Sequence, residues 1–129
     1  MAHNTLIVDD SSVVRKATRR IIEQAGVDVG EILEADNGQA ALEILQEHHV
    51  DLVLTDLHMP KMGGIELVHR MKADEATSSI AVVVVSSESS TSRINELRSE
   101  GITDYLRKPY TAEEFRQVIL NIFGVLTND

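Results

Sequence analysis

The chain has 129 residues, of which 43% are apolar, and this length fits one domain with a buried core. It contains no cysteine, which excludes disulfides and thiolate metal sites. Its net charge of -9 disfavours binding to nucleic acid or to an anionic membrane surface, and no apolar run approaches the roughly 20 residues of a membrane-spanning helix.

The predicted elements alternate between strands and helices along the chain. Short apolar runs mark the strands, and the run at 81–85 is continuous and rich in β-branched residues, as is typical of a strand covered on both faces. The expected strands are centred on residues 6–8, 32–33, 52–54, 81–85 and 105–106. The expected helices lie at about residues 13–25, 38–45, 65–71, 91–100 and 112–123.

Local signals indicate where several of these helices begin and end. The first helix meets Gly26, a residue type that commonly ends helices. Asn37 can cap the second helix, and Thr111 with Glu114 forms a capping box before the fifth. The apolar face expected for the first helix consists of Val13, Ala17, Ile21, Ile22 and Ala25.

The fourth helix, at about residues 91–100, has the weakest pattern. Only Ile94 and Leu97 are apolar, and the Ser and Thr residues at its start compete for backbone hydrogen bonds. We therefore expect a mobile surface there. The alternation of strands and helices as a whole predicts an α/β domain, with a parallel sheet covered by helices on both faces.

Polar residues follow four of the five predicted strands. Asp9 and Asp10 follow the first strand, Asp56 the third, Ser86 the fourth and Lys108 the fifth, whereas the second strand contributes no obvious polar group. Ligands of open α/β sheets bind beyond the carboxyl ends of the strands. The fold would therefore bring these five residues to one edge of the sheet.

Three carboxylates in a confined space need a counter-charge. A ligand set made only of oxygen atoms suits a hard cation such as Mg²⁺, which retains waters and shares its other positions with a phosphate. Lys108 offers a point charge for a phosphoryl oxygen, and Ser86 offers a hydroxyl donor. A carboxylate in such a setting can act as a nucleophile and form an acyl phosphate.

With these residues in place, the sequence resembles the receiver domains of two-component response regulators, particularly the single-domain chemotaxis type. The stretches that carry the resemblance are LIVDDS at 6–11, ADNG at 35–38, LTDLHMP at 54–60, VVS at 84–86 and YLRKPY at 105–110. They occur in the family order over nearly the whole chain. The resemblance implies a doubly wound, flavodoxin-like fold with five parallel strands in the order 2-1-3-4-5 and five helices.

The resemblance also implies the chemistry of the site. Asp56 would accept a phosphoryl group from a histidine kinase or a phosphotransfer protein. Asp10, Asp56 and the backbone carbonyl of His58 would bind Mg²⁺ directly, and Asp9 would act mainly through a water. Lys108 would contact the phosphoryl group. A receiver of this kind promotes its own phosphorylation and dephosphorylation, but it is a signalling protein rather than an enzyme.

Further residues would carry the switch. Ser86 would move towards the phosphoryl group, and Tyr105 would change between outward and inward rotamers. The peptide bond before Pro109 would be cis. Ser87, where a smaller residue is usual, would narrow access to the phosphoryl group. His58 and Glu88 occupy positions that tune hydrolysis in the family, and either His58 contacts the attacking water or its side chain simply faces solvent.

The expected partners follow from the same resemblance. A downstream target would bind the face formed by the fourth helix, the fifth strand and the fifth helix of a cytoplasmic monomer or weak dimer, with no nucleic acid and no membrane insertion. We expect one receiver domain at residues 1–129 with no output domain, and a role in chemotaxis is one possibility.

Three alternatives stay open. A degenerate receiver or a phosphate sink would keep the fold and change the role. An Asp-nucleophile phosphatase would need a second Asp where His58 stands. A flavodoxin-like electron carrier would need a glycine- and hydroxyl-rich phosphate loop in place of Asp9 and Asp10, and aromatic residues to sandwich a flavin.

Overall fold

The computed structural model describes residues 3–88 and 90–124, so the terminal residues of the predicted 1–129 domain lie outside the described part. Five parallel strands form one sheet in the order β2-β1-β3-β4-β5, which confirms the predicted fold. The strands are β1 (His3–Val8), β2 (Val29–Ala35), β3 (Leu52–Thr55), β4 (Ala81–Ser86) and β5 (Asp104–Arg107).

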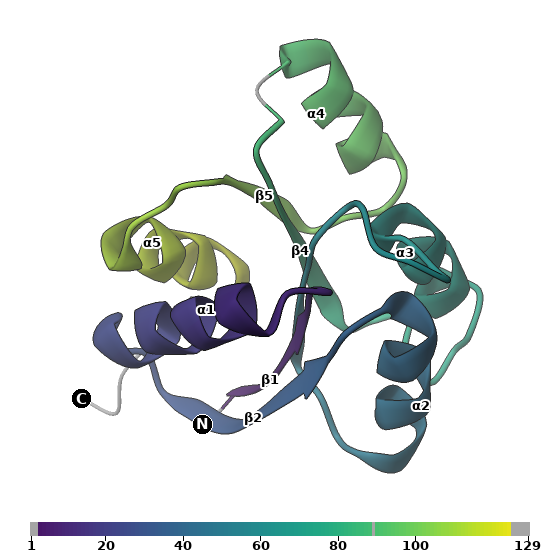
Figure 1. Cartoon of the computed structure of the whole chain (residues 1–129), viewed down its shortest axis with the longest axis horizontal. Coiled ribbons are helices and arrows are strands. Elements are labelled where there is room, and N and C mark those ends of the chain that lie inside the picture. The colour runs from purple at the N-terminus through teal and green to yellow at the C-terminus, as the bar shows by residue number, and fades with distance from the viewer. Residues whose placement is uncertain (1–2, 89, 125–129) are drawn as a thin grey trace.

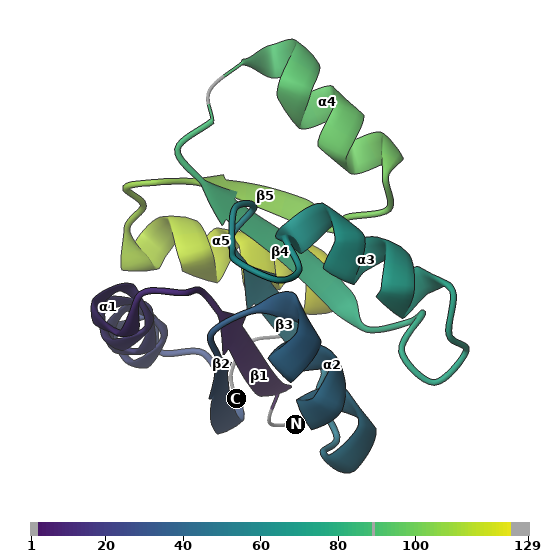
Figure 2. The ribbon, with the colours of Figure 1, turned by 45° about the vertical axis from the view of Figure 1, so that its right-hand side comes forward.

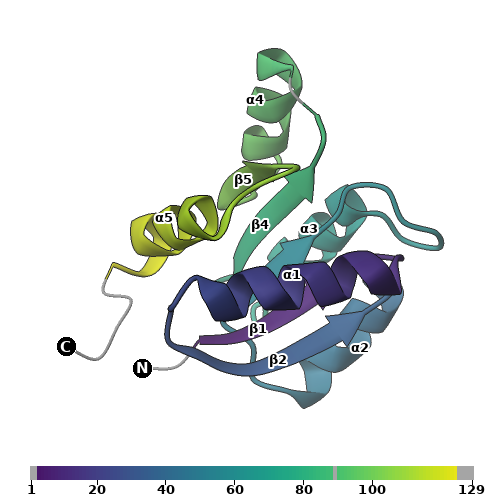
Figure 3. The same cartoon turned by 60° about the vertical axis from the view of Figure 1, so that its left-hand side comes forward.

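Helices cover both faces of this sheet (Figure 1). They are α1 (Ser12–Gln24), α2 (Gly38–Glu47), α3 (Gly64–Lys72), α4 (Thr91–Ser99) and α5 (Ala112–Phe123). Helices α1 and α5 lie side by side on one face, and α2 and α3 lie on the other (Figures 1 and 3). None of the helices in the described ranges is long and apolar enough to cross a membrane.

The core consists of two apolar clusters, one on each face of the sheet. Alternation along β4 divides its valines between them: Val83 and Val85 pack with α1 and α5, and Val82 and Val84 pack with α2, α3 and α4. Because strand side chains alternate between faces, a continuous apolar strand such as β4 requires helices on both sides.

The helix caps agree with the local signals. The Asn37 side chain accepts a hydrogen bond from the amide of Ala40, and Thr111 forms the predicted capping box with Glu114. Gly26 has a φ of 71°, a left-handed conformation that ends α1 with little steric cost.

The predicted apolar face of α1 is confirmed at Ile22 and Ala25, which are buried, but it was wrong for the first half of the helix. Val13 is 74% exposed and Ala17 is also exposed, whereas Thr18 and Ile22 are the buried residues of this helix. In the first half of the helix the buried position is therefore Thr18 rather than Val13 or Ala17. Val13 and Ala17 instead line an apolar groove beside Pro109 and Tyr110.

Helix α4 projects from the rest of the molecule (Figure 2). Leu97 is its single buried residue, in agreement with its weak apolar pattern. Two side-chain contacts hold its C-terminal end, an ion pair between Arg98 and Asp104 at 3.2 Å and a hydrogen bond between Glu100 and His69 of α3. Whether this surface is mobile stays a prediction.

Candidate functional site

The register of the sheet aligns the ends of the strands that carry the candidate residues. Val8 of β1 pairs with Thr55 of β3, and Thr55 pairs with Val84 of β4. Beyond the strand ends, the amide of Asp56 donates to the carbonyl of Val8 at 3.0 Å, and the amide of Lys108 donates to the carbonyl of Ser86 at 2.7 Å. Backbone pairing therefore fixes where these side chains leave the sheet.

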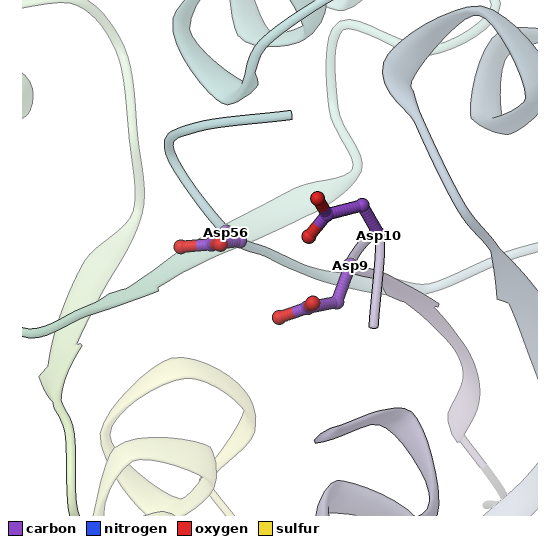
Figure 4. A group of neighbouring side chains, drawn as sticks. All are labelled: Asp9, Asp10 and Asp56. Atoms are coloured by element: carbon purple, nitrogen blue, oxygen red, sulfur yellow. The ribbon is translucent and has the colours of Figure 1, made fainter. Parts of the chain in front are cut away.

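Three carboxylates meet at this edge. Asp9, Asp10 and Asp56 each place one oxygen within 4.8 Å of the oxygens of the other two (Figure 4). They differ in exposure: Asp9 is buried, Asp56 is partly buried and Asp10 is exposed. The amide of Ser11 donates to Asp9 at 2.9 Å and the amide of Leu57 donates to Asp56 at 2.8 Å, so both carboxylates are oriented by their own loops.

Lys108 brings a positive charge to the carboxylates from a distant part of the chain. Its ammonium nitrogen lies 3.5 Å from Asp9 Oδ2 and 3.8 Å from Asp56 Oδ1. Burial nevertheless raises the pKa of Asp56 above its usual value, because the desolvation of the carboxylate outweighs the lowering effect of Lys108. One lysine therefore leaves the three carboxylates short of positive charge.

A divalent cation fits this deficit. The three clustered carboxylates offer only oxygen ligands, which suit Mg²⁺. Because Asp10 is exposed, one side of this cluster is open to water and to a phosphate. Asp9, Asp10 and Asp56 are the side chains that would hold the ion. Bound there, Mg²⁺ supplies charge neutralisation for a phosphoryl group.

Ser86 lies buried at the carboxyl end of β4, where its hydroxyl oxygen accepts a hydrogen bond from the amide of Glu88 at 3.2 Å. Its hydroxyl proton therefore stays available as a donor. Ser87 next to it is exposed, and Glu88 is half-buried.

Tyr105 is 9% exposed and points inward. Its hydroxyl donates to the carbonyls of Ser86 and Glu88, at 3.2 and 2.5 Å. The ring of Tyr105 is thus tied to the β4–α4 loop, which begins at the end of the strand that carries Ser86. This contact gives a physical connection between the acidic edge and the β5 surface.

The remaining predicted residues lie around the rim. The side chain of His58 is exposed, and its charge contributes a small lowering of the Asp56 pKa. The peptide bond between Lys108 and Pro109 is cis. Pro109 and Tyr110 also border the apolar groove beside α1.

Two features of the site were not predicted from the sequence. Gly64, the first residue of α3, packs directly against the backbone of Asp56: a Cβ at this position would lie 2.3 Å from the Asp56 carbonyl oxygen. Strand β2, for which no obvious polar group was predicted, carries Glu34 near its carboxyl end, where it binds Arg15 and Arg19 of α1. The four-residue spacing of these arginines was the available signal.

The sequence is also similar to known proteins. Residues 5–120 match the family described as response regulator receiver domain. The chain is similar to the chemotaxis protein CheY of Pseudomonas aeruginosa, with 35% identity over 92% of this chain and 94% of that protein. It is also similar to the chemotaxis protein CheY-3 of Vibrio cholerae, with 34% identity over 92% and 89% of the two chains.

The fold is similar to that of solved structures. The chain is similar to the chemotaxis response regulator CheY4 of Vibrio cholerae, with a TM-score of 0.84, 25% identity, and 95% and 100% of the two chains covered. It is also similar to a response regulator receiver domain protein from Clostridium thermocellum, with a TM-score of 0.79, 29% identity and 92% of each chain covered.

Proposed function

Because the chain belongs to the response regulator receiver domain family, we propose that it is a signalling switch controlled by Mg²⁺-dependent phosphorylation of Asp56. The observation that carries this proposal is the convergence of Asp9, Asp10, Asp56 and Lys108 at one edge of the sheet. The donor is a phosphohistidine of a histidine kinase or a phosphotransfer protein. CheY-type receivers are signalling proteins rather than enzymes with a turnover substrate.

The reaction transfers the phosphoryl group from the imidazole nitrogen to a carboxylate oxygen of Asp56. The N–P bond breaks, an acyl phosphate O–P bond forms, and the imidazole leaves with the electron pair. The ammonium group of Lys108 lies near the carboxylates of both Asp9 and Asp56. It is therefore close enough to contact an oxygen of a phosphoryl group attached to Asp56. The partly buried position of Asp56 strengthens each of these charge interactions.

We propose that the signal leaves through protein contacts on the α4–β5–α5 face. A phosphoryl group adds charge and acceptors beside Ser86, which favours donation by its hydroxyl. Movement of Ser86 acts on Tyr105 through the shared β4–α4 loop, because the Tyr105 hydroxyl binds the carbonyls of Ser86 and Glu88. The weakly buried helix α4 is the element that such a change reaches first.

The names of similar proteins suggest the signalling pathway. Because the similar proteins from Pseudomonas aeruginosa and Vibrio cholerae are chemotaxis proteins, we propose a chemotaxis-type pathway. We also propose that the protein acts in the cytoplasm as a monomer or weak dimer. The net charge of -9 supports a protein partner rather than nucleic acid.

We also propose that His58 adjusts the lifetime of the acyl phosphate through the attacking water. Its exposed position at the rim and its electrostatic effect on Asp56 support this role. Equal rates of phosphate loss in His58→Asn and the unmodified protein would rule it out.

The test of the main proposal is incubation with acetyl phosphate, with and without Mg²⁺, followed by intact-protein mass spectrometry. We expect a gain of one phosphoryl group that requires Mg²⁺ and is lost in Asp56→Asn. Asp51→Asn is the matched control, because Asp51 immediately precedes β3 at the opposite end of the same strand. The absence of both a phosphorylated species and a beryllofluoride complex would refute the proposal.

A further inference from the structure

An arginine of α1 connects the proposed Mg²⁺ site to the neighbouring strand. The side chain of Arg15, 17% exposed, donates from Nη1 to the backbone carbonyl of Asp9 at 2.6 Å. It also donates from Nε to Glu34 Oε1 at 2.9 Å. The accepting carbonyl belongs to the peptide that joins Asp9 to Asp10, which are both candidate ligands of the ion.

Glu34 is itself held in place. Arg19, one turn further along α1, donates to Glu34 Oε2 at 2.9 Å and to the carbonyl of Ile32 at 3.2 Å. Hydrogen bonds from Arg19, and then from Arg15, hold the pKa of Glu34 below its usual value despite partial burial, so this carboxylate is ionised at neutral pH. Glu34 also neutralises part of the positive charge that the two arginines place near a cation site.

The geometry points to Arg15, held by Glu34, as a positioning residue that orients the Asp9–Asp10 peptide for Mg²⁺ binding. A planar guanidinium can donate in two fixed directions at once, and this lets one side chain join β2 to the β1–α1 loop. The hydrogen bond from Arg15 fixes the direction of the Asp9 carbonyl, and this direction sets the plane of the peptide that leads to Asp10. Partners of this kind orient ligands without touching the ion.

This inference rests on the proposed function. Removing the charge of Arg15 distinguishes a positioning role from a purely electrostatic effect on Mg²⁺ binding. Removing a cation beside a cation site strengthens Mg²⁺ binding if only Coulomb forces act. Removing a positioning group weakens it. Arg15→Met therefore gives opposite signs under the two accounts, and the expected result is about tenfold weaker binding, at the lower end of the range for residues that orient ligands.

The experiment measures Mg²⁺ dissociation constants by calorimetry for the unmodified protein, Arg15→Met, Arg15→Lys and Lys16→Met. Lys16 is an exposed neighbour on the same helix, so its variant removes the same charge without touching the loop. We expect Lys16→Met to bind Mg²⁺ as tightly as the unmodified protein or slightly more tightly. Arg15→Lys should fall between, because an ammonium retains the charge but cannot reproduce both directed hydrogen bonds.

Two further measurements separate positioning from a general loss of folding. In the metal-free protein, Arg15→Met should show faster amide exchange at Asp10 and Ser11, with exchange in α5 unchanged. Adding Glu34→Gln to Arg15→Met should weaken Mg²⁺ binding no further, since Glu34 acts through Arg15.

Mg²⁺ binding by Arg15→Met as tight as that by Lys16→Met would overturn the inference and leave the proposed function standing. The same holds if Arg15→Lys, the variant least disturbing to the fold, binds as the unmodified protein does and shows unchanged exchange at Asp10. An unmodified protein that binds no Mg²⁺ would overturn both.

Discussion

Replacing Gly64 by alanine tests how closely helix α3 approaches the phosphoacceptor. The added Cβ would lie 2.3 Å from the carbonyl oxygen of Asp56 and 3.2 Å from its carbonyl carbon. Ordinary contacts begin at about 3.4 Å, so the start of α3 and the Asp56 backbone must separate by about 1 Å. Neither atom is at the end of a flexible side chain, and the shift therefore reaches the nucleophile.

The expected effects can be worked from this displacement. Overpacking of this kind costs about 1–3 kcal/mol of folding free energy, partly offset by about 0.4–1 kcal/mol from the reduced entropy of the unfolded chain. We therefore expect a net loss of about 1–2 kcal/mol in urea unfolding. A displacement of about 1 Å can cost about 100-fold in rate, so phosphorylation by acetyl phosphate should slow by about 10- to 100-fold.

Gly26→Ala is the control for this experiment. Gly26 has a φ of 71°, and its Cβ would meet only an ordinary contact 3.5 Å from Arg116. Alanine in this conformation costs about 1–2 kcal/mol, a similar loss of stability at the far end of α1. If both variants slow phosphorylation equally, or if folded Gly64→Ala reacts at the unmodified rate, the proposed close approach does not control the nucleophile.

Three further predictions concern pH, metal and the loop contact. Burial raises the pKa of Asp56, so the folded state binds this proton more tightly than the unfolded chain, and ionised Asp56 lowers the free energy of unfolding. In EDTA at pH 7, Asp56→Asn should therefore resist urea better than the unmodified protein. The difference should vanish as the pH falls below about 4, where the carboxyl group is protonated in both states. Mg²⁺ at 100 times the dissociation constant of the unmodified protein should add about 2.7 kcal/mol to its free energy of unfolding. An equal gain in Asp10→Asn at the same Mg²⁺ concentration would exclude Asp10 as a ligand. Tyr105→Phe should lose about 1 kcal/mol and exchange the Glu88 amide faster, whereas unchanged exchange would show that the hydroxyl does not hold the loop.

Much of the architecture could be predicted because its causes are local. Asn37 and Thr111 cap helices through bonds to residues three positions away, and the valines of β4 alternate between two faces by strand geometry alone. Parallel strands bring their carboxyl ends to one edge, so the grouping of Asp9, Asp56 and Lys108 followed from the order of elements.

Other features depended on distances between segments that are far apart in the sequence. In the first half of α1, packing against neighbouring elements leaves Val13 exposed and buries Thr18, and the periodic pattern alone does not distinguish these two positions. The inward position of Tyr105 depends on the carbonyl of Ser86, at the end of β4, and on that of Glu88, in the loop that follows; these residues precede it by 19 and 17 positions. A buried strand tyrosine is also compatible with an ordinary core position, so the sequence alone does not specify these two hydrogen bonds.

The sequence by itself determined which chemical groups this protein places at the carboxyl edge of its sheet, because alternating strands and helices predict a parallel sheet whose strands all end at that edge. Only the tertiary structure decided how those groups are held. The contact of Gly64 with Asp56 and the bonds from Arg15 to Asp9 and Glu34 arise where separate elements meet. Their geometry is set by packing to within tenths of an ångström, and no local pattern specifies a distance across the fold.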